Sequence, residues 1–197
     1  MPRTANPEVR HRLLTAGQEL IYAQGFAAVG VAELAAAAGI PKGSFYNYFE
    51  TKEDYAAEVA AFYWADIEAA YGPILSDPAL PPLTRVTRYF QALTDDHAGR
   101  GFLVGCLIGN LSLELASTSE RTRATLLGVL ARWENALAAC LWEAAQDGQL
   151  GLDRNVAELA ALLIEAWEGA VMRGKLDRSR TAYERFERVT LPRLLAG

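Results

Sequence analysis

The stretch GRGFLVGCLIGNLSLELA, residues 99–116, carries two series of residues that each recur every four positions. One series consists of Cys106, Asn110 and Glu114, on an otherwise apolar segment. Residues four apart share a face of a helix, so these three groups predict a polar stripe. Buried polar groups need hydrogen-bond partners, which makes the stripe a candidate lining for a ligand cavity. The other series, in which every member is a glycine, predicts close packing of another helix: Gly101, Gly105 and Gly109.

The sequence offers little support for an enzyme. The two histidines, His11 and His97, lie far apart and have no partner at metal-ligand spacing. We find no nucleophile elbow, P-loop or dinucleotide fingerprint. Five acidic residues give no convincing catalytic pair: Glu19, Glu33, Glu114, Glu165 and Glu168. We therefore expect neither an enzyme nor a metal or cofactor site.

A second candidate site lies in AAAAGIPKGSFYNYFETK, residues 35–52, where four aromatic residues occur within five positions. Phe45 and Phe49 are four apart, so we predict that both pack inward. Tyr46 and Asn47 point elsewhere and are candidates to contact phosphates and base edges, while Tyr48 is expected to contact the DNA backbone. Spacing alone leaves a second interpretation open, in which the whole aromatic cluster is core.

This stretch has the pattern helix, tight turn, helix. Alanine-rich positions allow two helices to approach closely, and Gly39 permits the turn between them. Pro41 suits the first turn of the second helix, where its missing N–H has no cost. Gly43 and Ser44 keep the start of that helix slim, so that backbone amides can approach a phosphate. The pattern favours a helix-turn-helix, whose second helix enters the major groove of DNA.

Helical periodicity extends over almost the whole chain, and about nine helices are predicted in an all-α fold. The first helix ends at Gly25, and Thr51 is predicted to cap the fourth, which ends before the Pro-rich residues 76–82. The other helices are predicted at these residues: 31–38, 42–49, 83–97, 102–116, 119–147, 155–174 and 180–191.

Composition is that of a globular protein of 197 residues, with 51% hydrophobic and 22% charged residues. The net charge is −5, but residues 1–52 hold five Lys/Arg against four Glu, or +1, which leaves −6 for the remainder. A nucleic-acid surface must therefore be local and near the N-terminus. Two cysteines make no disulfide framework, and neither a signal peptide nor a membrane span is predicted, so we expect a cytoplasmic protein.

The thirty residues FAAVGVAELAAAAGIPKGSFYNYFETKEDY resemble the N-terminal signature of the TetR family of bacterial transcriptional repressors. The resemblance lies in the Ala-Gly-Ile turn, the Lys-Gly-Ser-Phe-Tyr start of the third helix, the Tyr-Phe pair and the Lys-Glu opening of the fourth. The family often has Thr where this chain has Gly30 and Val31, and Ser where it has Pro41; we expect these departures to alter affinity. The resemblance implies a DNA-binding domain at residues 1–52 and a ligand-sensing and dimerisation domain at residues 53–197.

The resemblance also implies which residues contact double-stranded DNA. Lys42 and Lys52 would neutralise phosphates, and Asn47 with Tyr46 would read bases, since Asn can pair with adenine. Arg3 and Thr4 precede the first helix and are candidates for a flexible arm on the DNA backbone or minor groove. The full set of implied contacts is Arg3, Thr4, Lys42, Gly43, Ser44, Tyr46, Asn47, Tyr48 and Lys52.

Similar proteins bind a small molecule within helices four to eight and dimerise through their last two helices, here residues 155–174 and 180–191. The ligand changes the separation of two DNA-binding heads that must lie roughly 34–36 Å apart to read successive major grooves. The resemblance thus implies a homodimer, a palindromic operator and a small-molecule effector. Candidate pocket aromatics, each of which is more often core, are Phe62, Tyr89, Phe90, Phe102, Trp133 and Trp167.

The Gly-Cys-Leu…Asn-Leu pattern of residues 105–111 resembles a TetR subgroup that includes N-ethylmaleimide-responsive and acrylate-responsive repressors. The resemblance implies that Cys106 is a redox and electrophile sensor and that Lys175, in MRGKL, is its partner. A nearby ammonium lowers the pKa of a thiol, and the thiolate attacks electrophiles. The alternative for Cys106 is inert packing or a passive pocket wall, and Cys140 is read as core.

The sequence therefore predicts a repressor that leaves its operator when a ligand binds or Cys106 is modified. An activating role is left open. The alternative from another class is a small-molecule-binding protein or thiol-dependent enzyme on the same scaffold, without DNA binding.

Overall fold

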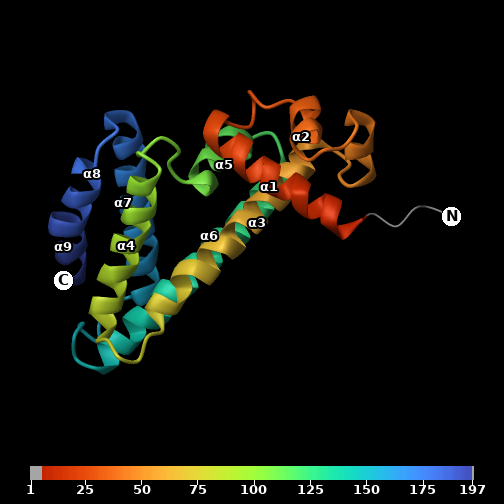
Figure 1. The fold of residues 1–197 in the computed structure, drawn as a ribbon. Coiled ribbons are helices and arrows are strands. Elements are labelled where there is room, and N and C mark those ends of the chain that lie inside the picture. Colours follow the sequence, from red (N-terminus) through yellow and green to blue (C-terminus); the bar gives the residue numbers. More distant parts are fainter. Residues whose placement is uncertain (1–5, 197) are drawn as a thin grey trace. The chain divides into compact units, whose positions relative to one another are not determined.

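The computed structural model describes residues 6–196, so the predicted contacts Arg3 and Thr4 lie outside the described residues. Regular structure within this range is entirely helical (Figure 1). It comprises a 3-10 helix, a π-helix and nine α-helices, which confirms the predicted all-α fold. The elements are α1 Pro7–Gln24, α2 Val31–Ala37, η1 Lys42–Asn47, α3 Lys52–Leu75, α4 Pro82–Gly99, α5 Leu107–Leu115, α6 Glu120–Gln146, α7 Val156–Asp177, α8 Thr181–Arg185, η2 Phe186–Thr190 and α9 Leu191–Ala196.

Local signals set several helix ends where the sequence predicts them. The α1 helix ends at Gly25, whose φ of +89° is left-handed backbone that favours glycine. Gly39, with a φ of +70°, makes the turn after α2. At the start of α3 the Thr51 hydroxyl accepts a hydrogen bond of 3.0 Å from the Asp54 amide, which confirms the predicted cap.

The helix predicted over residues 102–116 is wrong in its first part, because α5 begins only at Leu107. Gly101, Phe102 and Gly105 have φ values of +64°, +58° and +74°, which a right-handed helix cannot contain. The glycine series is therefore not a ridge on one helix. Cys106 lies just before α5, so it does not share a helical face with Asn110 and Glu114 as predicted.

Two further predicted helices differ in kind. Residues 42–49 were expected to be a helix, and the structure has the shorter 3-10 helix η1, with i→i+3 bonds from Ser44 N to Pro41 O and from Tyr48 N to Phe45 O. The helix predicted over 180–191 is instead a continuous series of α8, the π-helical segment η2 and α9, which extends to Ala196.

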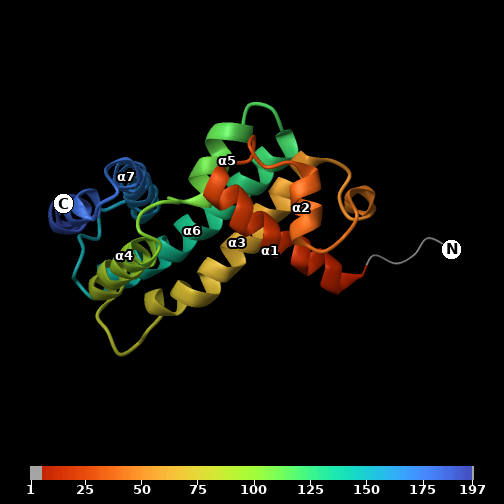
Figure 2. The same ribbon diagram turned by 45° about the horizontal axis from the view of Figure 1, so that its top comes forward.

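The chain packs as two compact units. Unit 1 is the chain up to Ala65 together with Leu107–Val129, and unit 2 is Asp66–Cys106 together with the chain from Leu130. In unit 1, α1 packs against both α2 and α5, and α2 packs against η1 (Figure 2). In unit 2, α7 packs against α8, η2 and α9 (Figure 1). The boundary at residue 52, expected from the family resemblance, stays a prediction.

Within residues 6–196, no helix has both the length and the apolar character needed to cross a membrane.

Candidate functional site

The aromatic cluster of residues 45–49 divides between core and surface in unit 1. Phe45 is fully buried and Phe49 is 3% exposed, as predicted from their spacing. Tyr46, between them, is 55% exposed, and Asn47 is exposed as well. Buried Phe45 of η1 and buried Phe49, two residues after η1, thus hold Tyr46 and Asn47 outward. This supports the interpretation that residues 42–49, called the recognition segment below, contact a partner over the interpretation that the whole cluster is core.

The anchor is a ring cluster with Tyr55 of α3. The Tyr55 ring centroid lies 5.1 Å from that of Phe45 and 4.8 Å from that of Phe49, both in edge-on geometry. The buried Tyr55 hydroxyl donates to the Leu13 carbonyl of α1 at 2.6 Å, and burial raises the pKa of this hydroxyl. Tyr55 therefore ties η1, α1 and α3 to one another.

The remaining predicted contacts lie around this segment. Lys42 and Gly43 are exposed, whereas Ser44 and Tyr48 are half-buried. A Cβ added to Gly43 would meet nothing within 4 Å, so packing within the chain does not require glycine there. The structure thus brings Lys42, Gly43, Ser44, Tyr46, Asn47 and Tyr48 together on η1 and the residue that follows it.

Lys52 has an intramolecular role that the sequence did not suggest. Its Nζ donates to the Phe26 carbonyl at 2.6 Å and lies 4.0 Å from the centroid of the Phe26 ring. Burial lowers the pKa of Lys52, and the carboxylates of Glu53 and Glu114 oppose that shift. The ammonium thus holds the turn that precedes α2.

Glu114 of α5 holds the same turn from the other side. Its two carboxylate oxygens accept hydrogen bonds from the Phe26 and Ala27 amides at 3.0 and 2.9 Å. A carboxylate that accepts two backbone N–H bonds is a strong link between distant segments. Glu114 was expected to line a ligand cavity as part of a polar stripe; in the structure it binds the turn between α1 and α2.

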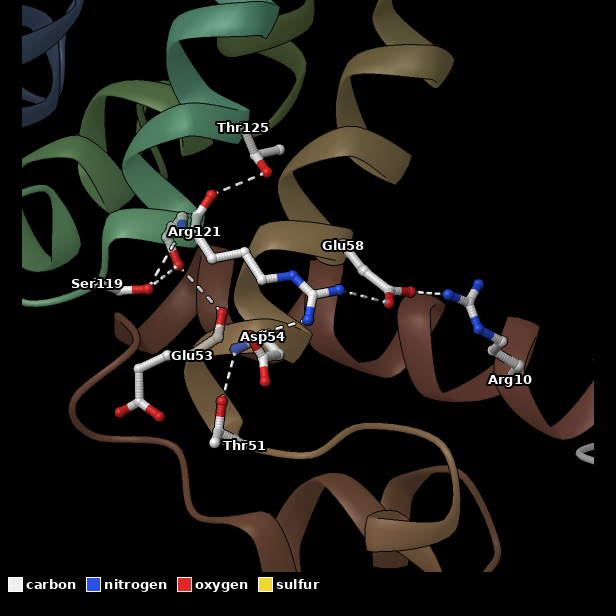
Figure 3. A network of polar contacts seen from close by, with 9 residues as sticks. Arg10, Thr51, Glu53, Asp54, Glu58, Ser119, Arg121 and Thr125 are labelled. Atoms are coloured by element: carbon white, nitrogen blue, oxygen red, sulfur yellow. Dashed lines mark hydrogen bonds and ion pairs between the residues drawn. The ribbon is translucent and has the colours of Figure 1, made fainter.

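A polar network joins α1, α3 and the start of α6 within unit 1 (Figure 3). Arg121 of α6 pairs with Asp54 at 3.0 Å and with Glu58 at 3.7 Å, and Arg10 of α1 pairs with the other oxygen of Glu58. The buried Thr122 hydroxyl donates to the Glu53 carbonyl at 3.1 Å. Exposed ion pairs contribute little singly, but together these contacts link the first turns of α3 to α1 and α6 within unit 1.

The cysteine of the second candidate site is enclosed in unit 2. Cys106 is 7% exposed, and its thiol is hydrogen-bonded to the side chain of Glu168 on α7. Burial raises the pKa of Glu168, and the bond from Cys106 opposes that shift. The second oxygen of this carboxyl, Oε1, is also enclosed and has no hydrogen-bond partner among the described residues.

Tyr183, whose hydroxyl interacts electrostatically with both members of this thiol–carboxyl pair, belongs to a cluster of aromatic side chains. The ring centroid of Tyr183, on α8, lies 5.3 Å from that of Phe102, in a tilted arrangement, and 5.3 Å from that of Trp167, edge-on. Its hydroxyl is 2.7 Å from His97 Nδ1. Burial lowers the pKa of His97 to about 4, so this imidazole is neutral at pH 7. The cluster extends to Phe90, 5.4 Å from Trp167 between centroids.

The structure brings together most of the predicted pocket aromatics, but not all. Tyr89, Phe90, Phe102, Trp133 and Trp167 all belong to unit 2, and Trp133 is hydrogen-bonded to Tyr89. Phe62 belongs to unit 1, where its ring packs edge-on against His11 at 5.4 Å.

The polar residues assigned to the sensor differ in their surroundings. Asn110 is half-buried within α5 in unit 1, and Lys175 is exposed in the last turn of α7. The predicted pairing of Lys175 with Cys106 stays a prediction, whereas the thiol is hydrogen-bonded to Glu168, which lies seven residues before Lys175 on the same helix. From the sequence, Glu168 is considered only among acids that form no catalytic pair, and its contact with Cys106 is not predicted. The available signal was an acid directly after an apolar tryptophan on a largely apolar helix.

Cys140 is a buried residue of the core, as predicted. It is 2% exposed, its Sγ donates to the Pro82 carbonyl at 3.4 Å, and burial raises its pKa to about 11. A thiol with this pKa holds almost no thiolate at pH 7.

Comparison with known proteins gives matches across both parts of the chain. Residues 13–59 match "Bacterial regulatory proteins, tetR family", and residues 82–190 match "Tetracyclin repressor-like, C-terminal domain". The HTH-type transcriptional repressor DhaR of Mycobacterium sp. (strain GP1) is 34% identical over 191 residues, which cover 97% of this chain and 94% of the relative. The transcriptional regulator AcuR of Cereibacter sphaeroides is 36% identical over 165 residues, with coverages of 84% and 75%.

A solved structure agrees with these matches. The crystal structure of reduced NemR from Escherichia coli superposes with a TM-score of 0.81 at 26% identity, over 92% of this chain and 95% of that one. The predicted resemblance is confirmed, and with it the expectation of a regulator in place of an enzyme. The chain belongs to the TetR family of bacterial transcriptional regulators.

Proposed function

We propose that the protein is a homodimeric repressor that binds a palindromic operator through η1 and releases it when an electrophile modifies Cys106. The observation that carries the DNA-binding part is the division of residues 45–49, in which buried Phe45 and Phe49 hold Tyr46 and Asn47 outward. An exposed Asn on a segment that enters the major groove can pair with adenine, and a Tyr beside it can reach phosphate or base edges.

Further support comes from the edges of the same segment. Lys42 adds an exposed cation, and the open space at Gly43 lets another molecule approach the backbone closely. Lys42, Gly43, Ser44, Tyr46, Asn47 and Tyr48 make up the proposed DNA contacts on and next to η1. Lys52 remains among the proposed phosphate contacts, although its ammonium also binds the Phe26 carbonyl.

The proposal of a dimer is supported by exposed apolar side chains on α7 and the C-terminal segment. Met172 and Leu176, one helical turn apart on α7, are 61% and 74% exposed, and Leu162 of the same helix is 43% exposed. Val189 of η2 is 43% exposed as well. Exposed apolar side chains on neighbouring elements commonly mark an interface between proteins. A twofold dimer has two recognition segments, which is why a palindromic operator is proposed.

The effector part of the proposal is supported by Cys106. Its thiol is enclosed with an acid and aromatic rings in unit 2, which favours a small reagent over a large one. The crystal structure of the relative NemR is that of its reduced form, which is a property of that protein. For this chain it supports a thiol whose state depends on oxidants or electrophiles. A reversible ligand is the second candidate, favoured by the aromatic rings of Tyr89, Phe90 and Trp167.

Selection of bound sequences from a random DNA pool, with and without N-ethylmaleimide, tests this function. We expect a palindrome that is enriched by untreated protein and lost after treatment, and Cys106→Ser protein should keep it after treatment. Cys140→Ser is the matched control and should behave as wild type, since that thiol is buried and has a raised pKa. A palindrome that survives treatment of the wild type would favour the reversible ligand, and absence of any enriched sequence would contradict DNA binding.

A further inference from the structure

The acid beside Cys106 is the least explained group in unit 2. Glu168 is hydrogen-bonded to the Cys106 thiol, and its Oε1 is enclosed without a hydrogen-bond partner among the described residues. Enclosing a polar atom without a partner costs free energy, about 1–3 kcal/mol in proteins. An apolar side chain would fill the same space without this cost, so packing does not account for an acid here.

Chemistry at the thiol does account for it. A thiol must lose its proton as its sulfur forms a bond to carbon, and a carboxylate hydrogen-bonded to that thiol can receive the proton directly. Burial raises the pKa of Glu168, which makes this carboxylate a better proton acceptor than an exposed one. Lys175, the partner implied by resemblance, is exposed in the last turn of α7.

We propose that Glu168 accepts the proton of Cys106 when the thiol adds to an uncharged α,β-unsaturated carbonyl compound, and that the same acid disfavours electrophiles carrying a negative charge. This inference rests on the proposed function, in which Cys106 is the site where the effector reacts. It adds the identity of the proton acceptor and the charge class of the effector.

The step balances without any other reactant. The sulfur of Cys106 bonds to the β-carbon of the electrophile, and the π electrons of the carbon–carbon double bond move to the α-carbon and carbonyl as an enolate. The thiol proton passes to Glu168 and then to the α-carbon. The products are a thioether and the regenerated carboxylate, so nothing is oxidised or reduced overall.

The charge preference follows from the surroundings. The hydroxyls of Tyr89 and Tyr183 interact electrostatically with the Cys106 thiol, and Tyr183 also interacts with Glu168. Burial is the main cause that raises the pKa of both hydroxyls, so they are uncharged at pH 7, and the Glu68 carboxylate that also acts on Tyr89 adds a negative charge. His97, bonded to the Tyr183 hydroxyl, is neutral as well because burial lowers its pKa to about 4. A second carboxylate brought next to Glu168 would meet a like charge in a poorly screened site.

The test uses two maleimides that share the reactive ring, uncharged N-ethylmaleimide and anionic N-carboxymethylmaleimide. Rates of adduct formation at Cys106 are measured on the full chain by quenching, digestion and peptide mass analysis, which separates Cys106 from Cys140. We expect wild type to react faster with N-ethylmaleimide. Glu168→Gln should slow that reaction by at least about tenfold, since general-base assistance contributes on the order of a hundredfold or more. Glu168→Gln should also lower the ratio of the rate with N-ethylmaleimide to the rate with N-carboxymethylmaleimide.

Two further variants separate chemistry from packing. Glu165→Gln makes the same change at an exposed position one turn earlier on α7, and it should react as wild type. Glu168→Asp keeps the charge but retracts it by one methylene, so it should react slowly while retaining the preference for the uncharged reagent. Circular dichroism and operator binding of untreated protein check the fold; if Glu168→Gln does not fold, Glu168→Asp decides the question.

The outcomes distinguish the two proposals. Absence of a Cys106 adduct in wild type would contradict the proposed electrophile response itself. An adduct that forms in wild type and forms equally fast or faster in Glu168→Gln, with an unchanged reagent preference, would overturn the role of Glu168 and leave the electrophile response standing. The role of Glu168 would also be overturned if Glu168→Asp both reacted slowly and no longer preferred the uncharged maleimide.

Discussion

The two units of the chain place their polar side chains in opposite ways. Unit 1 turns Tyr46 and Asn47 outward on a segment whose phenylalanines are buried. Unit 2 turns Cys106, His97 and the acid of Glu168 inward among aromatic rings. An outward polar group can be reached by a partner as large as a DNA duplex, whereas an enclosed one can be reached only by a small molecule. The contrast between the units is thus a contrast in the size of what each can bind.

Substitutions of these polar groups should also have different effects on the free energy of unfolding in the two units. Outward polar groups keep their hydration, so replacing them is expected to alter binding with little effect on stability. Enclosed groups lose their hydration, so each one is coupled to the free energy of folding through its hydrogen bonds and its protonation state. Substitutions in the two units should therefore separate into binding effects and stability effects.

The largest effect is expected at His97 in unit 2, as a dependence of stability on pH. Burial lowers the pKa of His97 from 6.5 to about 4, helped by Arg100 and opposed by Asp96. Between these pKa values the unfolded chain binds more protons than the folded chain, so stability is full above about pH 7 and falls as the pH drops. We expect a loss of about 2 kcal/mol between pH 7 and pH 5 from this group, measured by urea unfolding at each pH.

The control for this prediction is a matched substitution in unit 1. His97→Gln removes the titrating imidazole and should flatten the pH dependence, although it should lower stability at pH 7 by disturbing the 2.7 Å contact with Tyr183. His11→Gln, at an exposed position, should keep the slope of the wild type. Equal slopes for wild type and His97→Gln would show that the enclosed polar groups of unit 2 do not set its acid sensitivity.

The next effect is expected at Asn47 in unit 1 and should appear only in DNA binding. Asn47→Ala removes a side chain that can make a bidentate pair with adenine, which is worth about 1–3 kcal/mol of discrimination. We expect operator affinity to fall by that amount in fluorescence anisotropy, with the midpoint of urea unfolding unchanged. Asn135→Ala, the same change at an exposed position of α6, should alter neither quantity. A large loss of stability in Asn47→Ala would contradict the outward role of this residue.

Sequence periodicity predicted the outward site better than the enclosed one, for a physical reason. Phe45 and Phe49 are close in sequence, so their shared inward face follows from local spacing. The enclosed site depends on groups far apart in the chain, since the acid on Cys106 comes from residue 168. Periodicity also failed at residues 101–105, because a series of glycines can mark left-handed backbone as well as close helix packing.

The smallest effects should distinguish the two lysines that flank the recognition segment. Lys42 is exposed, and as a phosphate contact it should release about one counterion on binding. Lys42→Ala should therefore weaken binding to all sequences alike and reduce the salt slope of the affinity by about 1. Lys52 binds the Phe26 carbonyl, so Lys52→Met, which keeps the apolar stem, should lower stability by about 1 kcal/mol. If the salt slope of Lys52→Met is unchanged, the Lys52 ammonium serves only the turn before α2. A drop of about 1 in the slope would show that the same ammonium also contacts a DNA phosphate. In that case one residue of unit 1 would both stabilise the fold and bind DNA.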